Sequence, residues 1–305
     1  MNKQFYKYTS LLLAITGLIS LESNAQLKTA AGSNSLLWEV TGNGLRSPIY
    51  LYGTMHLICS EDAVLSNELN EVIKQSSEIY FEMDLDDPAQ IILGSQLSLM
   101  RDDTTLEDLL NEEEYQRVES FFVENGLEAE FMSVRRMQPM MISSLVYQTF
   151  LNCQGVEGVE MAIMQKAHSL RKSIKGLETA EYQASLLDKI PYSKQAKDLL
   201  FTIDNIAEAK NEADILQELY WQQDVDRLLE QSLKLEAGMS EEVQAAIITE
   251  RNLAWVNKIA DSEGMKTVLF AIGAGHLGGK NGMLQLLKDR GFTVRPIENN
   301  RIRVI

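Results

Sequence analysis

Two of the three histidines in this chain stand in the same local setting, and their chemistry suits metal binding. His56 and His276 each follow a short run of β-branched and aromatic residues, and each completes the pattern Gly-x-x-His-Leu. Two imidazoles and one carboxylate form a ligand set that suits Mn, Fe, Co or Zn and leaves coordination positions open for water and substrate. The repeated setting therefore favours one shared site over two separate packing roles.

Glu82 is the carboxylate that the pattern offers to the two histidines. It ends a predicted strand and lies between Phe81 and Met83, where a carboxylate needs a partner. We therefore predict that His56, Glu82 and His276 are ligands of one divalent metal ion.

The third histidine, His168, is predicted to be a surface residue. It lies near the end of a helix predicted for residues 158–172, where a cation complements the helix dipole. It is not part of the predicted site.

Both Gly-x-x-His motifs are followed by a helical pattern and then a strand pattern. We interpret this as a duplicated strand–GxxH–helix–strand unit in an α/β fold, with both halves in one mixed central sheet. Such a sheet places both imidazoles at the carboxyl ends of its strands, where α/β proteins bind ligands. The predicted helices and strands after the two motifs cover residues 63–77, 78–82, 281–290 and 292–298.

The remainder of the chain is predicted to be largely helical. A β-hairpin with an Asn43-Gly44 turn precedes the first motif. A large helical insertion subdomain is predicted for about residues 88–264, interrupted by one short strand at 173–177. A second hairpin, around Asn299-Asn300, makes residues 301–305 a terminal strand. Helices are predicted, among others, for residues 106–125 and 139–151.

The first 25 residues have the pattern of a secretory signal peptide. Lys3 and Lys7 precede a short apolar stretch at 11–19, and Ala25 ends a small-residue cleavage site. We therefore expect an exported, periplasmic or secreted protein whose single domain covers residues 26–305. No membrane span is expected in the mature chain, because no other apolar run approaches the length that a bilayer requires.

The net charge and the two cysteines limit the binding partners and the cellular compartment that we expect. A formal net charge of −16 is poorly suited to nucleic acid, which needs Lys and Arg to displace counterions. Export permits a disulfide between Cys59 and Cys153, and the sequence leaves open whether they pair.

An ordered set of motifs resembles the TraB/GumN family, which is related to the Tiki proteases of animals and more distantly to the erythromycin esterase and ChaN folds. The resemblance runs from about Leu36 to Ile297. Its motifs are Leu51-Tyr-Gly-Thr-Met-His-Leu57, Phe81-Glu82, Gly158-Val-Glu-x-x-Ile163 with Ala167, Gly176-Leu-Glu-Thr179 with Gln183, Glu250-Arg-Asn252 with Trp255, and Ala271-Ile-Gly-Ala-Gly-His-Leu277 with Gly291.

The resemblance implies a two-half fold and a hydrolase that uses a divalent metal (Mn, Co or Zn) on peptide or protein substrates. His56, Glu82 and His276 match the metal-site residues proposed for the family. Glu160 stands where the family usually has Asp, and its role is left open. Three further polar residues match motif positions: Glu178, Arg251 and Asn252.

Arg251 is predicted to act with a carboxylate. A buried guanidinium needs an anionic partner, so we expect Arg251 to face Glu178 or Glu160 close to both histidines. There it could neutralise an oxyanion or orient Glu178, while Glu82 or Glu178 serves as general base. The alternative for Glu178, Arg251 and Asn252 is a salt-bridge network between helix and sheet.

The sequence favours an exported metal-dependent hydrolase, a peptidase acting on peptides or protein termini. One alternative is a non-catalytic protein that binds a peptide, haem or a metal. Another is a metal-independent, esterase-like hydrolase with a histidine as general base. The sequence predicts neither the natural substrate nor the metal nor the oligomeric state.

Overall fold

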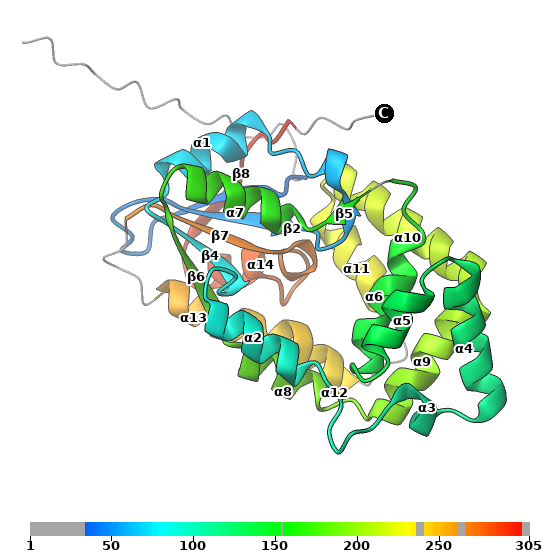
Figure 1. Ribbon diagram of the computed structural model, residues 1–305. Coiled ribbons are helices and arrows are strands. Elements are labelled where there is room, and N and C mark those ends of the chain that lie inside the picture. Colours follow the sequence, from blue (N-terminus) through cyan, green and yellow to red (C-terminus); the bar gives the residue numbers. More distant parts are fainter. Residues whose placement is uncertain (1–33, 154, 236–240, 261–265, 301–305) are drawn as a thin grey trace, which may run out of the picture.

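The computed structural model describes residues 34–153, 155–235, 241–260 and 266–300 (Figure 1). The expected signal peptide (1–25) and terminal strand (301–305) lie outside these residues. Within them, the predicted α/β class is confirmed: a six-stranded mixed sheet carries helices on both faces and a helical extension.

The sheet has the strand order β6-β4-β7-β2-β1-β8. Its strands are β1 (Leu37–Thr41), β2 (Ile49–Thr54), β4 (Glu78–Met83), β6 (Ser173–Glu178), β7 (Val268–Gly273) and β8 (Thr293–Pro296). β6, β4, β7 and β2 are mutually parallel, whereas β1 and β8 add an antiparallel edge. Four parallel strands therefore end at the same edge of the sheet.

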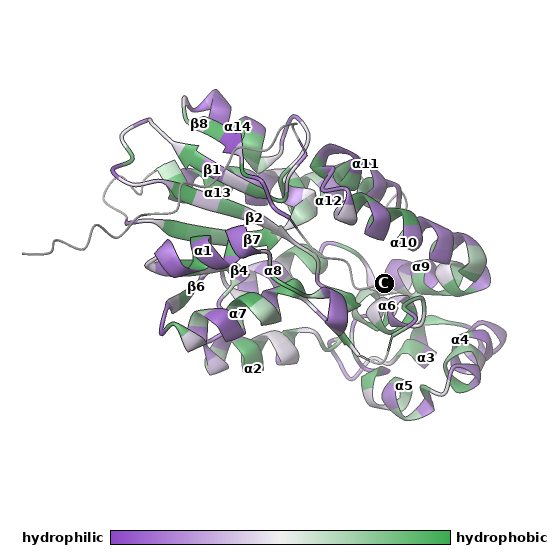
Figure 2. Ribbon diagram, turned by 90° about the horizontal axis from the view of Figure 1, so that it is seen from above, coloured by the Kyte–Doolittle hydropathy of each residue, from purple (hydrophilic) through white to green (hydrophobic). Residues whose placement is uncertain are grey.

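β2 and β7 lie at the centre of the sheet and are apolar on both faces. Every residue of β2 is buried, as are the first five of β7, which is typical of parallel strands covered on both sides. Figure 2 shows this apolar centre between helices whose outer surfaces are more polar.

Two pairs of helices cover the sheet. α1 (Asn67–Gln75) lies beside α7 (Val159–Ser169) on one face, and α13 (Arg251–Ala260) lies beside α14 (Met283–Asp289) on the other (Figure 1). Each buries aliphatic or aromatic residues in the same core as the strands. The predicted helices of the two units are thus present, each starting a few residues later than expected.

The two Gly-x-x-His units differ in their last strand. β4 joins the parallel centre of the sheet, between β6 and β7, whereas β8 pairs antiparallel with β1 at the edge. The duplicated pattern therefore describes the strand, motif and helix of each unit, but the final strands take different places.

Within the predicted insertion (88–264), some helices share an apolar core of their own, whereas β6, α7 and α13 pack in the core of the sheet. Leu106, Phe122, Phe131, Ile142 and Leu199 are among the buried residues of the separate helical core, and Phe122 stacks on Phe131 with ring centroids 4.6 Å apart. The predicted helix 106–125 is divided in two, because Asn111 forms a capping box that begins a new helix. The helices of the insertion are α2 (Pro88–Leu97), α3 (Leu106–Leu109), α4 (Glu112–Glu124), α5 (Glu128–Val134), α6 (Pro139–Gln148), α8 (Ala180–Leu187), α9 (Tyr192–Asp204), α10 (Ile206–Trp221), α11 (Val225–Leu235) and α12 (Glu241–Gln244).

Cys59 and Cys153 form a disulfide, which answers the question that the sequence left open. The bond lies beside a two-stranded sheet in which β3 (Ile58–Cys59) pairs with β5 (Val156–Glu157). Closing a loop across a sequence separation of 94 residues restricts the unfolded chain, and such bonds typically contribute about 2–4 kcal/mol. The disulfide and the short sheet together fix the segment after His56 against the segment before Glu160.

None of the helices in the described ranges has the length and apolar character needed to cross a membrane.

Candidate active site

The predicted site residues meet at the carboxyl edge of the parallel strands. His56 follows β2, Glu82 lies near the end of β4, Glu178 ends β6, and His276 ends a short 3-10 turn after β7. A Cβ placed on Gly273 would lie 3.1 Å from Oε1 of Glu82, 3.6 Å from Cδ2 of His276 and 3.8 Å from Nε2 of His56. The two imidazoles and the carboxylate therefore converge on one point of the backbone.

Glu82 is held as an anion in a nearly buried position. Its Oε1 accepts a hydrogen bond from the N–H of Gly273 at 2.8 Å, and its Oε2 accepts one from Nη2 of Arg251 at 2.5 Å. Burial alone raises the pKa of Glu82, but His276, Arg251, His56 and the Gly273 N–H outweigh it and hold the pKa at about 2. Glu82 is consequently ionised at any physiological pH.

Arg251 joins this carboxylate to a second one, as the sequence predicted for Glu178. Its side chain is 8% exposed, and Nη2 also donates to Oε1 of Glu178 at 2.6 Å. Trp255 donates from Nε1 to the other oxygen of Glu178 and places its ring 4.7 Å from the guanidinium carbon. Arg251 therefore faces Glu178 and Glu82, and the predicted alternative partner Glu160 lies elsewhere.

The backbone before Arg251 is a π-helix, residues Ala245–Glu250, between α12 and α13. The wider turn is common where a helix adjusts its register at a functional site. Nη1 of Arg251 donates back to the carbonyl of Ile247 at 3.3 Å, so the arginine is also tied to this segment.

His276 is a buried, neutral imidazole whose tautomer is fixed by Asn252. The amide nitrogen of Asn252 donates to the carbonyls of His276 and Asn281, so its oxygen faces Nδ1 of His276 at 2.8 Å and accepts the proton there. Burial lowers the pKa of His276 to about 4. Nε2 thus carries the lone pair, 3.1 Å from Nη1 of Arg251 and 3.9 Å from Oε1 of Glu82.

His56 is the exposed member of the set. Its side chain is 67% exposed, and its Nδ1 lies 2.7 Å from Oε1 of Glu160, whose side chain is only 10% exposed. The Glu160 carboxylate raises the pKa of His56. Glu160 lies in the first turn of α7. The sequence left its role open, and the structure shows that it pairs with Nδ1 of His56.

The set fits a divalent metal in the type and orientation of its donors. Nδ1 of His276 faces the Asn252 oxygen and Nδ1 of His56 lies 2.7 Å from Glu160, the arrangement that orients histidine ligands, and Nε2 of His276 lies 3.9 Å from Glu82. The ligand atoms are spread more widely than the 4.8 Å within which all donors of a compact cluster lie. Ion binding at about 2.0–2.3 Å therefore requires the three side chains to draw together and Arg251 to give up its contact with His276.

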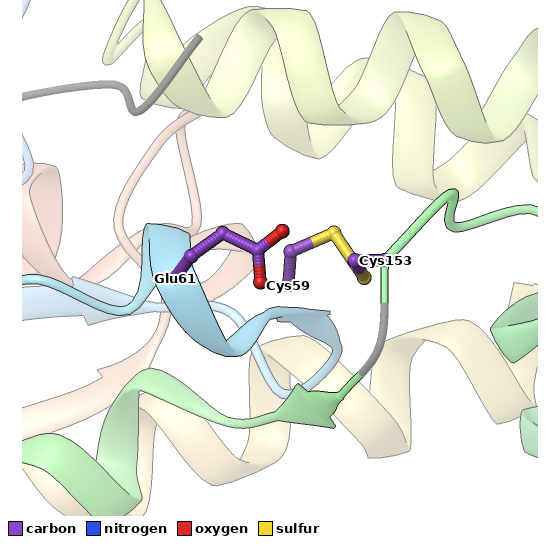
Figure 3. A group of neighbouring side chains, drawn as sticks. All are labelled: Cys59, Glu61 and Cys153. Atoms are coloured by element: carbon purple, nitrogen blue, oxygen red, sulfur yellow. A yellow bond between two sulfur atoms is a disulfide. The ribbon is translucent and has the colours of Figure 1, made fainter.

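Another cluster of metal-type side chains lies at the disulfide. Among the described residues, Cys59, Glu61 and Cys153 bring their donor atoms within 4.8 Å of one another (Figure 3). Both sulfurs are already bonded to each other, so they are not thiolate ligands.

A cavity of about 310 Å³ opens beside the site. Its polar wall contains His56, Glu82, Glu160 and Gln183. Its apolar wall contains Phe81, Met83, Leu85, Met161 and Ala271. The sequence did not predict this cavity, because its wall combines residues from β4, α7, β7 and α8.

The structure also shows where the remaining predicted residues lie. Glu178, Arg251 and Asn252 do form the network between helix and sheet that the alternative describes, and this same network reaches Glu82 and His276. His168 lies on the surface, 47% exposed and paired with Asp86 at 2.9 Å.

The comparisons with known proteins show the family of this chain. The TraB/PrgY/gumN family matches residues 36–296. The chain belongs to the TraB/PrgY/gumN family. This membership confirms the resemblance seen in the ordered motifs, since the match covers every one of them.

Relatives of this chain include proteins named as metalloproteases. It is 25% identical over 318 residues to Metalloprotease TIKI1 of Danio rerio, which covers 86% of this chain and 63% of the relative. It is 24% identical over 351 residues to Metalloprotease TIKI1 of Homo sapiens, which covers 92% of this chain and 66% of the relative. It is 24% identical over 271 residues to the uncharacterized protein YbaP of Escherichia coli strain K12, which covers 86% of this chain and 97% of the relative. The chain thus spans less than two thirds of either TIKI1 protein, and no solved structure matches it.

The buried charge network generates a stability prediction. Glu178→Gln should lower the free energy of unfolding by about 3 kcal/mol, the low end for breaking a buried ion pair, because Arg251 keeps Glu82 as a partner. Urea unfolding followed by circular dichroism measures this. Glu181→Gln, an exposed carboxylate of α8, is the matched control and should change stability by less than about 0.5 kcal/mol. Equal stabilities for both variants would show that the network is not a stabilising element.

Proposed function

We propose that this chain is an exported, metal-dependent hydrolase that cleaves peptide bonds in peptides or at protein termini. The observation that carries the proposal is the convergence of two oriented imidazoles and a buried carboxylate at the edge of a sheet, beside a cavity. The relatives named as metalloproteases support the same reaction class. Family membership alone does not fix a reaction, so the proposal depends on the site.

The residues that would hold the metal are His56, Glu82 and His276, through Nε2 of each imidazole and a carboxylate oxygen. The metal, Mn, Co or Zn, would lower the pKa of bound water and polarise the scissile carbonyl. Charge balance favours such an ion. With His276 neutral and His56 protonated beside Glu160, the carboxylates Glu82, Glu160 and Glu178 still exceed the cations Arg251 and His56 by one negative charge.

The protein's own groups then have distinct roles. Asn252 accepts a hydrogen bond from Nδ1 of His276, which directs the lone pair of Nε2 in that imidazole, and Glu160 pairs with Nδ1 of His56. Arg251 presents a guanidinium next to the carboxylate ligand, where it stabilises negative charge that develops on a substrate oxygen. Glu178 and Trp255 hold that guanidinium in position, Glu178 by accepting its hydrogen bonds and Trp255 by placing its ring against it.

The hydrogen bonds and the exposure of Glu82 and Glu178 distinguish the two candidate general bases. Glu178 is 5% exposed, accepts hydrogen bonds from Arg251 and Trp255, and does not line the cavity. Glu82 does line it. We therefore assign the positioning of Arg251 to Glu178. Glu82 would accept a proton from the attacking water only through an oxygen that does not bind the metal.

A metal-independent hydrolase is the second candidate, and the His56–Glu160 pair favours it. The imidazole of His56 lines the cavity and has a carboxylate beside its Nδ1, which is the arrangement of a general base. Peptide turnover that persists after complete removal of metal by a chelator would select this candidate. Loss of turnover, restored by Mn, Co or Zn, would select the first.

Export is supported by the leader pattern of residues 1–25 and by the Cys59–Cys153 disulfide, a bond typical of oxidising compartments. We expect the exported protein to begin near Gln26. Intact-mass measurement and amino-terminal sequencing of the exported form test this. A form that retains residues 1–25, or one with two free thiols, would contradict it.

Metal binding provides a direct test of the ligand set. His56→Ala should abolish binding of Mn or Zn to protein purified without a histidine tag, because it removes one of three ligands. Its stability should change little, because the His56 side chain is largely exposed. Isothermal titration calorimetry measures the binding, and His168→Ala is the matched control that should change neither property. An unaltered affinity in His56→Ala would remove His56 from the site.

Arg251→Met should lower kcat for a peptide substrate by about 100-fold while raising KM much less, because charge stabilisation matters most in the transition state. Arg251→Lys, which keeps the charge, should recover part of the loss. Steady-state kinetics on variants whose folding is verified by circular dichroism measures this. Unchanged turnover in Arg251→Met would reduce the residue to a purely structural role.

A further inference from the structure

The cavity beside the site has a second character that the reaction chemistry leaves unused. The polar groups of its lining include His56, Glu82 and Glu160. The lining also has five apolar side chains, those of Phe81, Met83, Leu85, Met161 and Ala271. We call these five residues the apolar pocket. Its place next to Glu82 means that a group bound in it lies beside the bond being cleaved.

The size of the space limits what it accepts. At about 310 Å³ the cavity stands at the lower end of the range of small-ligand sites, so it holds one large side chain with its adjoining peptide group. A folded protein surface cannot enter a space of this size, whereas an extended peptide or a chain terminus can.

Several side chains of the apolar pocket are accessible. Met161 is 38% exposed, and Met83 and Leu85 are only partly buried. Methionine is unbranched and adapts its shape to different neighbours. A pocket with Met83 and Met161 in its wall is therefore suited to several apolar side chains rather than to a single shape.

Gln183 adds a polar group of the kind that binds a peptide backbone. It lies on α8, is partly buried and lines the same cavity. Within the described residues its side-chain amide makes no hydrogen bond to another protein group. The amide offers two donors and one acceptor, which matches the C=O and N–H of a peptide group.

The surrounding charge excludes one class of side chain. Glu82 and Glu160 stand in the wall of the cavity with little exposure of their own. An acidic side chain would meet like charges there and would also lose its hydration.

We propose that the apolar pocket binds an aliphatic or aromatic side chain of the substrate residue adjoining the scissile bond, while Gln183 holds the neighbouring peptide group. This inference rests on the proposed peptidase function and adds the substrate class: peptides with Leu, Met or Phe at that position. The fit of one apolar side chain typically changes kcat/KM by about 10–100-fold.

Internally quenched peptides that differ at one position test the inference. We expect kcat/KM to be about 10–100-fold higher for Leu, Met or Phe than for Ser or Asp at the position next to the cleavage site. Met161→Asp should remove most of this preference, since it places a carboxylate in the apolar pocket. Met141→Asp is the matched control, because Met141 is also 38% exposed but lies on α6 and not in the cavity wall.

A second variant keeps the test valid if Met161→Asp does not fold. Met161→Ala enlarges the pocket and should shift the preference towards Phe over Leu. Gln183→Ala should raise KM for every peptide in the series without changing their order. A preference that none of the Met161 variants alters would overturn the assignment of the pocket.

The outcomes separate this inference from the proposed function. Equal turnover of all the peptides would refute the apolar specificity and leave the peptidase function standing. Absence of turnover for every peptide, with and without added Mn, Co or Zn, would refute the peptidase function instead. In that case fluorescence anisotropy with the same peptides measures binding, and equal affinity for the Leu and Asp peptides would refute the pocket as well.

Discussion

The buried guanidinium of Arg251 is the constraint on which the site depends. An unpaired charge in this position would cost several kcal/mol, and two carboxylates from neighbouring strands remove that cost. Because Glu82 belongs to β4 and Glu178 to β6, the pair of contacts fixes α13 against two strands at once. The same guanidinium also faces Nε2 of His276. One side chain thereby holds together the helix, the sheet edge and the imidazole of His276.

The parallel centre of the sheet makes this convergence possible. β2, β4, β6 and β7 run in one direction, so the residues after them reach the same edge although they are far apart in the sequence. The exposed His56 is the exception to the tight packing, since it lies on a loop. There the Cys59–Cys153 bond and the short β3–β5 pairing hold the loop near Glu160. The site thus combines a rigid inner part around Arg251 with an outer histidine restrained by a covalent bond.

The sequence predicted the inner part because local patterns carried the necessary information. A Gly-x-x-His motif after an apolar strand places a histidine at the carboxyl edge, and Glu82 at the end of its strand reaches the same edge. The pairing of Arg251 with Glu178 followed from the charge of a buried arginine. The contact of Arg251 with Glu82, the partnership of Glu160 with His56, and the cavity were not predicted. Each of these depends on how separate elements pack, which the sequence of one element does not contain.

Some features of the fold were missed for the same reason. β8 has the same local pattern as other strands, but its place at the antiparallel edge depends on β1. The division of the predicted helix at 106–125 depends on the capping box at Asn111, a local signal that the apolar pattern across it concealed. Both cases show that periodicity located the elements more reliably than it located their ends or their neighbours.

The central claim is that His56, Glu82 and His276 hold one ion. X-ray absorption spectroscopy of the cobalt-loaded protein tests it most directly, since imidazole ligands give characteristic outer-shell scattering. The account predicts two imidazole nitrogens and carboxylate oxygen at about 2.0–2.2 Å, with one imidazole lost in His276→Ala. A first shell of oxygen alone, or a spectrum that His276→Ala leaves unchanged, would contradict it.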